Sequence, residues 1–355
     1  MAEIPGLPLD APEVETDDAV EEPSPLRNLW ASMSAVVTKE LRWRMRGRRA
    51  YVVVTLYVAL LGLLVFSVYQ VSYDAATRQF APNTGEPFQT DAVSGTASAV
   101  IGQAIFSVIL VLQTLLTLLL APALTSGAVS MEREKQTLEL LITTPVSTLG
   151  LVLGKLASSL AYVVILVLAS IPLMSLVFVF GGIAPEDVVR AYLMLFIVSF
   201  GVGSIGLFLS AWFKRTQIAT AISLVIVFGI SFIAPLVHGY VYISGVTFGD
   251  GQVERRPPPE PLVWFSAIAA DIDLVCTAIP DSYTVTCGYS TTVVGQELDQ
   301  QNPPRDVLWP RISLAFLILG VILTLATTQL ISPSRRLRAD RSIPPAQDHL
   351  FEPVT

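Results

Sequence analysis

The sequence predicts an all-α polytopic membrane protein with six transmembrane helices, and three observations support this fold class. Hydrophobic residues make up 52% of the chain and charged residues only 14%, whereas soluble domains carry about 25% charged residues. The mean hydropathy is +0.62. The charges are also clustered, so that apolar runs of roughly 20 residues or more remain, which is long enough for a helix to cross the hydrocarbon of a membrane.

The apolar runs give the expected bounds of the spans. We expect them at about 51–73, 99–127, 149–180, 188–212, 217–243 and 308–331. Pro122 and Pro172 lie inside the second and third spans, where they predict kinks. The fourth span carries the small residues Gly201, Gly203 and Gly206, which favour close packing against a neighbouring helix over a ligand site.

The distribution of Lys and Arg predicts the orientation. Most of these residues lie before the first span, after the sixth, and in the loops that share a side with both termini. The positive-inside rule therefore predicts cytoplasmic termini, with the 128–148 segment also in the cytoplasm and the 244–307 loop outside. We expect a multi-pass protein of the cell inner (plasma) membrane.

The two ends of the chain differ from the spans in composition. Residues 1–25 are acidic and rich in Pro, which predicts a disordered tail, and residues 339–355 are expected to form a cytoplasmic tail. Between them, the membrane domain covers 26–338. Residues 26–49 predict an interfacial amphipathic helix with a basic face that includes Lys39 and Arg42. Simple anchoring of the first span by the same basic residues is an equally good explanation.

The 128–148 segment is charged and helix-forming in an otherwise apolar chain. Its core, residues 131–141, reads MEREKQTLELL, with acids near the helix start and Leu138 and Leu141 on one side. Pro145 disfavours helical geometry at the residue before it. We expect a small amphipathic helix at the membrane surface that docks a partner, and a solvated loop helix without a partner is the alternative.

The 244–307 loop is too long for a simple turn. Within it, residues 261–278 are apolar but interrupted by Asp271 and Asp273, which predicts a re-entrant or surface-lying helix and not a seventh span. Cys276 and Cys287 are the two cysteines of the chain. They are a candidate disulfide if this loop lies in an oxidising compartment, and two unpaired thiols are the alternative.

Few polar residues lie inside the predicted spans. Gln103, Gln113, Thr114 and Thr117 are in the second span, and His238 is near the outer end of the fifth. Such groups face protein or water, and hydrogen bonds between helices explain them better than the lining of a transport path. No Asp, Glu, Lys or Arg lies near the middle of a predicted span, which argues against an ion-coupled carrier.

No catalytic, cofactor-binding or metal-binding residues are predicted. The nearest approach to a phosphate-binding loop, residues 150–156, has the wrong spacing and lacks the hydroxyl residue. The two histidines, His238 and His349, are distant in sequence and form no metal-binding pattern. We therefore expect neither an enzyme nor a nucleic-acid-binding protein.

Several motifs together resemble the type-2 ABC exporter permeases. Residues 131–141, the Thr-Pro-Val-Ser step at 144–147 and the Gly-Lys pair at 154–155 keep the order and spacing of that family. Residues 39–42, followed by the basic cluster at 46–49, are similar to its N-terminal connecting helix. The long polar insert at 279–307 and the acidic N-terminal tail depart from the family pattern.

The resemblance implies the membrane permease subunit of an ABC transporter, an exporter that moves substrate with ATP hydrolysed by a separate cytoplasmic ATPase subunit. Two six-span halves, identical or different, would work together in the lipid membrane, and this chain would bind no cofactor of its own. The coupling helix would comprise Glu132, Arg133, Glu134, Thr137, Leu138 and Glu139. The second and fifth spans would face the other half, with Gln103, Gln113 and Thr117 as candidates for lining the path.

Two other functions remain open from the sequence. An ATPase-independent membrane scaffold or sensor is the main alternative, and a secondary carrier is the weaker one. A scaffold would tolerate loss of the charges in the 128–148 segment, and a carrier would work without ATP. Substrate and transport direction do not follow from the sequence.

Overall fold

The computed structural model describes residues 33–34, 37–38, 48–79, 90–136, 148–244, 246–249, 252–255, 260–278 and 308–331. The predicted tails at 1–25 and 339–355 lie outside these residues, as does the insert at 279–307. Of the predicted interfacial helix at 26–49, only residues 33–34, 37–38 and 48–49 are described, all of them helical. Its amphipathic character therefore stays a prediction.

Six helices in the described part of the chain are long and apolar enough to cross a membrane. They run from Tyr51–Ala75, Ser98–Glu134, Thr148–Phe180, Pro185–Trp212, Thr216–Val241 and Trp309–Ile331. This confirms the six predicted spans, with bounds that agree within a few residues except at the end of the second. That span runs past its predicted end at 127 because a short helix extends it to Glu134.

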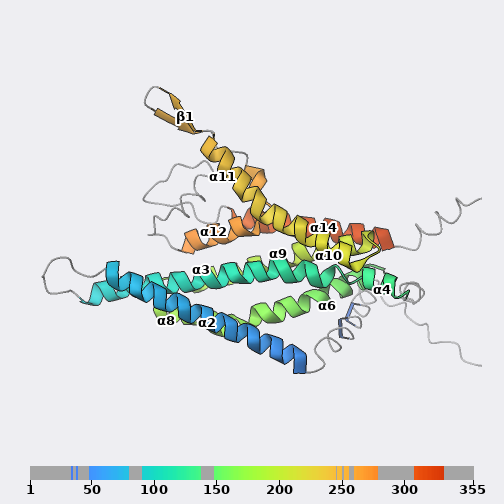
Figure 1. Cartoon of the computed structure of the whole chain (residues 1–355), viewed down its shortest axis with the longest axis horizontal. Coiled ribbons are helices and arrows are strands. Elements are labelled where there is room, and N and C mark those ends of the chain that lie inside the picture. Colours follow the sequence, from blue (N-terminus) through green and yellow to red (C-terminus); the bar gives the residue numbers. More distant parts are fainter. Residues whose placement is uncertain are drawn as a thin grey trace, which may run out of the picture.

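The spans are built from ten α-helices and one π-helical segment, which is described below. In chain order the α-helices are α2 (Arg48–Gln79), α3 (Thr90–Thr125), α4 (Ser130–Glu134), α6 (Thr148–Ala169), α7 (Ile171–Met174), α8 (Leu176–Phe180), α9 (Pro185–Trp212), α10 (Thr216–Phe228), α11 (Ala234–Ser244) and α14 (Trp309–Ile331). The spans alternate in direction, so that α2 begins and α14 ends at the same end of the bundle as α4 (Figure 1). We call this the α4 end.

The fourth span, α9, lies at the centre and packs mainly against α14 and α3. Its glycines allow the close approach that the sequence predicts. A Cβ atom at Gly201 would lie 2.7 Å from the carbonyl oxygen of Phe316, and one at Gly206 would lie 2.9 Å from that of Pro122. Backbone atoms cannot move aside as a flexible side chain can, so only glycine fits at these two crossings.

Besides the second span, which is interrupted by a turn at 126–129, two spans depart from regular α-helix. The third span breaks at Ser170 and continues as α7 and α8, with Pro172 in the first turn of α7, which confirms the predicted interruption there. The fifth span contains a π-helical segment, η1 (Gly229–Ile233), between α10 and α11. This segment was not predicted from the sequence. Such π-helical turns recur at functional sites.

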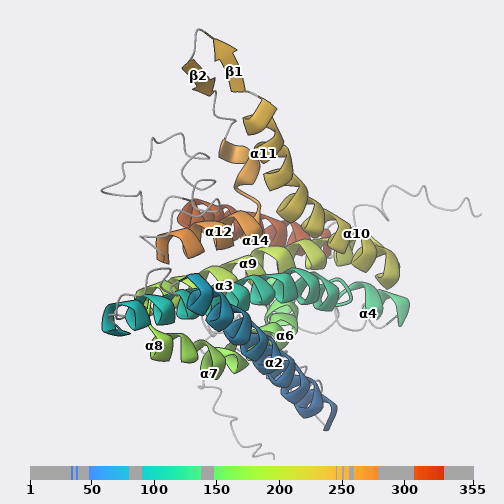
Figure 2. The same cartoon turned by 60° about the vertical axis from the view of Figure 1, so that its left-hand side comes forward.

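The end of the bundle opposite α4 carries the predicted long loop. Two short strands, β1 (Val246–Gly249) and β2 (Gln252–Arg255), form an antiparallel hairpin with Val246 opposite Arg255. The hairpin projects from the end of α11, away from the bundle (Figure 2). The hairpin was not predicted, but the all-α fold class is confirmed, because helices make up nearly all of the described structure.

The apolar part of this loop forms η2 (Glu260–Val263) and α12 (Ala267–Ala278). The α12 helix is too short to be a span, as predicted. It is buried against α3, α14 and α9, so it is part of the bundle and does not lie on its surface. A re-entrant path through the membrane itself stays a prediction.

Candidate functional site

The segment that joins the second and third spans is an elbow at the α4 end, which we define as residues 126–136. A turn at 126–129 follows α3, and α4 then continues in nearly helical fashion, with the amide of Arg133 donating to the carbonyl of Val129 at 3.1 Å. The helix ends at Glu134, and Gln136 adopts a left-handed conformation with φ of 56°. The prediction of one helix over 131–141 is therefore wrong.

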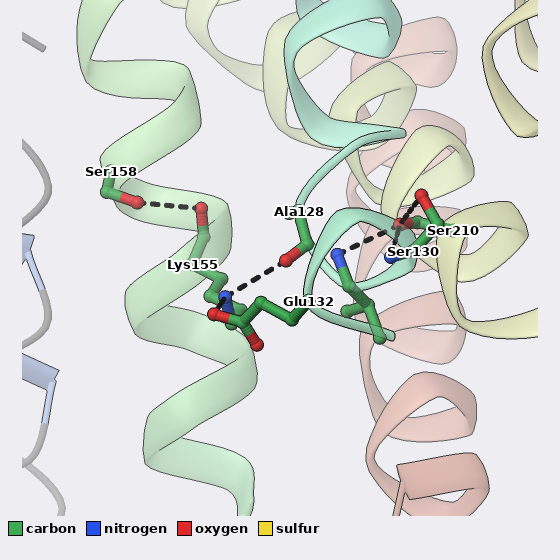
Figure 3. Close-up of polar contacts among 7 residues, drawn as sticks. Ala128, Ser130, Glu132, Lys155, Ser158 and Ser210 are labelled. Atoms are coloured by element: carbon green, nitrogen blue, oxygen red, sulfur yellow. Dashed lines mark hydrogen bonds and ion pairs between the residues drawn. The ribbon is translucent and has the colours of Figure 1, made fainter. Parts of the chain in front are cut away.

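The elbow is bound to the third span by a buried ion pair (Figure 3). The Nζ of Lys155 on α6 lies 2.6 Å from Oε1 of Glu132 and donates to the carbonyl oxygen of Ala128 at 2.9 Å. Lys155 is 3% exposed. A buried ammonium group is costly unless it is paired and hydrogen-bonded, so Glu132 and Ala128 together satisfy the lysine that enters the third span.

The fourth span holds the elbow by its backbone. The Oγ of Ser210 accepts hydrogen bonds from the amides of Val129, at 3.0 Å, and Ser130, at 2.9 Å (Figure 3). These amides belong to the start of α4, where the first N–H groups of a helix have no partner within the helix. Val129 at the N-cap position has no side-chain acceptor, so Ser210 caps α4 from a distant element.

The fifth span holds the elbow through three further contacts. The Oε1 of Glu134 accepts from the amide of Thr216 at 2.7 Å. The Ser130 hydroxyl donates to Oγ1 of Thr216 at 3.1 Å, and the hydroxyls of Ser126 and Thr220 lie 2.6 Å apart. Because Thr216 begins α10, the Glu134 carboxylate caps that helix and also complements its dipole. The elbow is thus bonded to the third, fourth and fifth spans.

The elbow contains three of the predicted coupling residues, Glu132, Arg133 and Glu134. The carboxylates of Glu132 and Glu134 bind helices of this same chain, and their role in docking a partner stays a prediction. The exposed residues of the elbow are Met131, Glu134, Lys135 and Gln136, and Glu132 and Arg133 are half-buried. The other predicted coupling residues, Thr137, Leu138 and Glu139, lie outside the described part of the chain.

The predicted polar residues of the second span are mostly buried. Gln113, Thr114 and Thr117 have almost no exposed area, and Gln103 is half-buried. Thr114 makes the expected bond between elements, and its hydroxyl donates to Oδ1 of Asp271 on α12 at 2.9 Å. The amide of Gln113 and the hydroxyl of Thr117 make no hydrogen bond of standard geometry with a described residue, so bonding between helices stays a prediction for these two.

Two buried tyrosines lie near these groups. The hydroxyl of Tyr57 on α2 has Gln113 and Tyr192 as polar neighbours, although it makes no hydrogen bond of standard geometry with a described residue. The hydroxyl of Tyr192 on α9 lies 2.9 Å from that of Ser170. Buried polar groups without protein partners are the groups that ordered water satisfies in membrane and soluble interiors alike.

The remaining candidates are placed as follows. His238 is buried on α11. Cys276 is half-buried on α12, while Cys287 lies outside the described residues, so the disulfide stays a prediction. Sequence reasoning missed Ser210 and Thr216, because one sits in the small-residue stripe of the fourth span and the other at an ordinary helix start.

Comparison with known proteins shows the family to which the chain belongs. A search among curated proteins gave no match. The family model described as "ABC-2 family transporter protein" matches residues 34–303, which include the first five spans, the elbow and α12. This match covers more than half of the chain and agrees with the resemblance carried by residues 131–155. The chain therefore belongs to the ABC-2 family of transporter proteins, in which it is a multi-pass membrane permease.

Proposed function

We propose that this permease is one half of an exporter whose energy comes from a separate cytoplasmic ATPase subunit, which docks at the elbow and the residues that follow it. The observation that carries the proposal is the bonding of the elbow to three spans at once, through Lys155, Ser210 and Thr216. A segment that only reversed the chain direction needs no such contacts, because a few turn residues suffice.

The contacts explain how a push on the elbow reaches the membrane. Separating Lys155 from Glu132 would leave a charge buried without its partner, which costs about 3–5 kcal/mol in buried pairs. Moving the start of α4 away from Ser210 would leave two buried amides without an acceptor, at about 1–3 kcal/mol for each unsatisfied group. Displacing the third, fourth and fifth spans together with the elbow avoids both costs.

The exposed residues of the elbow provide the surface on which the ATPase docks. Met131 is 46% exposed, and Lys135 and Gln136 follow it on the same outward turn. Charge of both signs is available for recognition, because Glu134 and Lys135 are both exposed there. ATP would bind and react in the partner subunit, and this chain would contribute no catalytic group.

The second half of the transporter is proposed to pack on the second and fifth spans. The fifth span presents large apolar side chains, among them Val225, Leu236 and Tyr240, each at least 70% exposed in the isolated chain. Gln113 and Thr117 would be the polar groups of the path on the second span. Lipid is expected to cover the apolar faces that the second half leaves free.

The proposal is tested by mild purification of the tagged chain from its native membrane. We expect a soluble subunit with a phosphate-binding loop to co-purify, with ATP hydrolysis that vanadate inhibits. The Lys135→Glu variant should lose this subunit while keeping its own folding, because Lys135 is exposed on the elbow. Repeated isolation of the intact permease alone, in the mildest detergents, would favour the scaffold.

A further inference from the structure

The α12 helix, outside the six spans, brings a buried carboxyl group into the bundle. Asp271 has no exposed area, and its Oδ1 accepts from Thr114 at 2.9 Å. Its Oδ2 has no hydrogen-bond partner among the described residues. Thr114 lies near the middle of the Ser98–Glu134 helix. The carboxyl therefore lies at the level of the middle of the second span, where the spans themselves carry no acid.

The other contacts of α12 do not involve Asp271. The Ser266 hydroxyl, just before the helix, donates to the carbonyl of Ser231 in the π-helical segment at 2.8 Å. The Oδ2 of Asp273 accepts from the amides of Leu308, at 3.0 Å, and Trp309, at 2.8 Å. These bonds tie α12 to the fifth and sixth spans. The bond between Asp271 and Thr114 ties it to the second.

Within the described part of the chain, no charged group compensates an ionised Asp271. The titratable residues on the elements that pack against α12 are Glu186, Asp187, Arg190 and Tyr192 on α9, Arg311 on α14, and Asp273 and Cys276 on α12 itself. Arg190 pairs with Asp187 at 3.2 Å and with Glu186. The described side chains of α3 and of the π-helical segment include no titratable group.

Burial and one hydrogen bond therefore decide the protonation state of the Asp271 carboxyl group. Burial raises the pKa of Asp271 well above its ordinary value, and the bond from Thr114 opposes this to a smaller extent. A buried carboxylate with a single hydrogen bond is costly, and such groups take up a proton instead. A proton on Oδ2 leaves Oδ1 as the carbonyl-type acceptor for Thr114, which is the observed geometry.

We propose that Asp271 is protonated when α12 is packed in the bundle and acts as a proton-dependent latch between α12 and the second span. Loss of the proton places a negative charge in the bundle, and water is the group that can stabilise it. The unpartnered atoms of Gln113 and Thr117, on either side of Thr114 in the sequence, can hydrogen-bond the entering water. Ionisation therefore opens the polar face of the second span to water.

The latch is tested with a cysteine reporter in the full-length purified chain. Cys276 and Cys287 are replaced by Ser, Gln113→Cys is introduced, and the rate of reaction with a water-soluble maleimide is measured from acidic to alkaline pH. The same reporter is measured with Asp271→Asn, an isosteric variant that cannot ionise. The rate measured with Asp271 present is divided by the rate measured with the Asp271→Asn variant. This ratio cancels the titration of the reporter thiol itself.

We expect this ratio to rise about tenfold per pH unit below the pKa of Asp271, because the ionised fraction rises by that factor. Asp273→Asn is the matched control and should leave the pH dependence of the ratio intact, since Asp273 is already held by two amides. A ratio that stays constant across the pH range would overturn the latch.

A second measurement covers the case in which the reporter perturbs packing. Dicyclohexylcarbodiimide adds to protonated carboxyl groups in apolar surroundings, and mass spectrometry locates the adduct. The chain with its native sequence should be labelled at Asp271 and not at Asp273. The labelling of Asp271 should decrease at alkaline pH. Labelling of Asp273 in preference to Asp271 at neutral pH would contradict a protonated Asp271. Neither measurement involves the ATPase, so failure of the latch would leave the proposed docking intact.

Discussion

The Nζ of Lys155 and the Oε1 of Glu132 lie 2.6 Å apart and join the third span to the extended end of the second (Figure 3). The two partners differ in burial, since their side chains are 4% and 27% exposed. Water can therefore partly replace the lysine at Glu132 but cannot replace the carboxylate at Lys155. This asymmetry leads to the first prediction.

Glu132→Gln should destabilise the permease more than Lys155→Met, because only the first change leaves a buried ammonium group without its charged partner. The loss for Glu132→Gln should approach about 3 kcal/mol, the low end for a broken buried pair, given that Glu132 is partly solvated. The double variant should recover part of this loss. Thermal unfolding in one detergent checks all three proteins, and strictly additive losses would contradict the pairing.

Ser210→Ala should loosen the start of α4. The change leaves the buried amides of Val129 and Ser130 without their acceptor, at about 1–3 kcal/mol for an unsatisfied group. Hydrogen exchange at these amides should become faster. Ser199→Ala is the matched control on the same helix, because the Ser199 hydroxyl donates to the carbonyl of Phe196 in its own helix. Equal effects of the two substitutions would contradict the capping role.

Replacing a glycine by alanine should have opposite effects on stability at Gly206 and at Gly62. Gly206→Ala would place a Cβ atom 2.9 Å from the carbonyl oxygen and 3.0 Å from the Cα of Pro122, so α9 and α3 would have to separate. Gly62→Ala meets its nearest atom, in Leu173, at 4.0 Å. It should stabilise α2 by about 0.5–1 kcal/mol, since Gly is unfavourable in a helix. The purified yield and the thermal stability of each variant are measured. A Gly206→Ala variant as stable as the native protein would contradict the close crossing of α9 and α3.

Asp271 should make stability depend on pH. Burial raises the pKa of this carboxyl above its ordinary value of 3.8, so the folded chain holds the proton more tightly than the unfolded chain does. The contribution of Asp271 to the free energy of unfolding is fully present below the pKa that this group has in the unfolded chain. The contribution is lost as the pH rises towards the pKa of the group in the folded chain. The Asp271→Asn variant should not show this loss, and it should be more stable than the native protein at the upper end of the pH range. Parallel Tm-against-pH curves for the two proteins would contradict it.

The spans could be predicted from the sequence because a membrane helix needs a long apolar run, and such runs are visible without tertiary information. Pro172 likewise marked the break in the third span, since proline removes a helical hydrogen bond. The small residues of the fourth span indicated a packing face, and Gly201 and Gly206 lie at such crossings.

The site was less predictable because its contacts join distant segments. The charges of Glu132 and Glu134 were visible, but their direction depends on Lys155 and on the start of α10, which only folding brings near. The helix over 131–141 was expected from its pattern and the position of Pro145, whereas the chain turns at Gln136. The depth of Asp271 follows from the packing of α12 against Thr114 and has no local signal.

Docking of an ATPase on the elbow can be measured by site-specific photo-crosslinking in native membranes. A benzophenone side chain is introduced at Lys135, exposed on the elbow, and in a second protein at Tyr240, which is 72% exposed on α11 away from the α4 end. We expect a crosslink from position 135, and none from position 240, to a soluble protein with a phosphate-binding loop. Crosslinks from position 135 only to lipid or to other membrane proteins would contradict it.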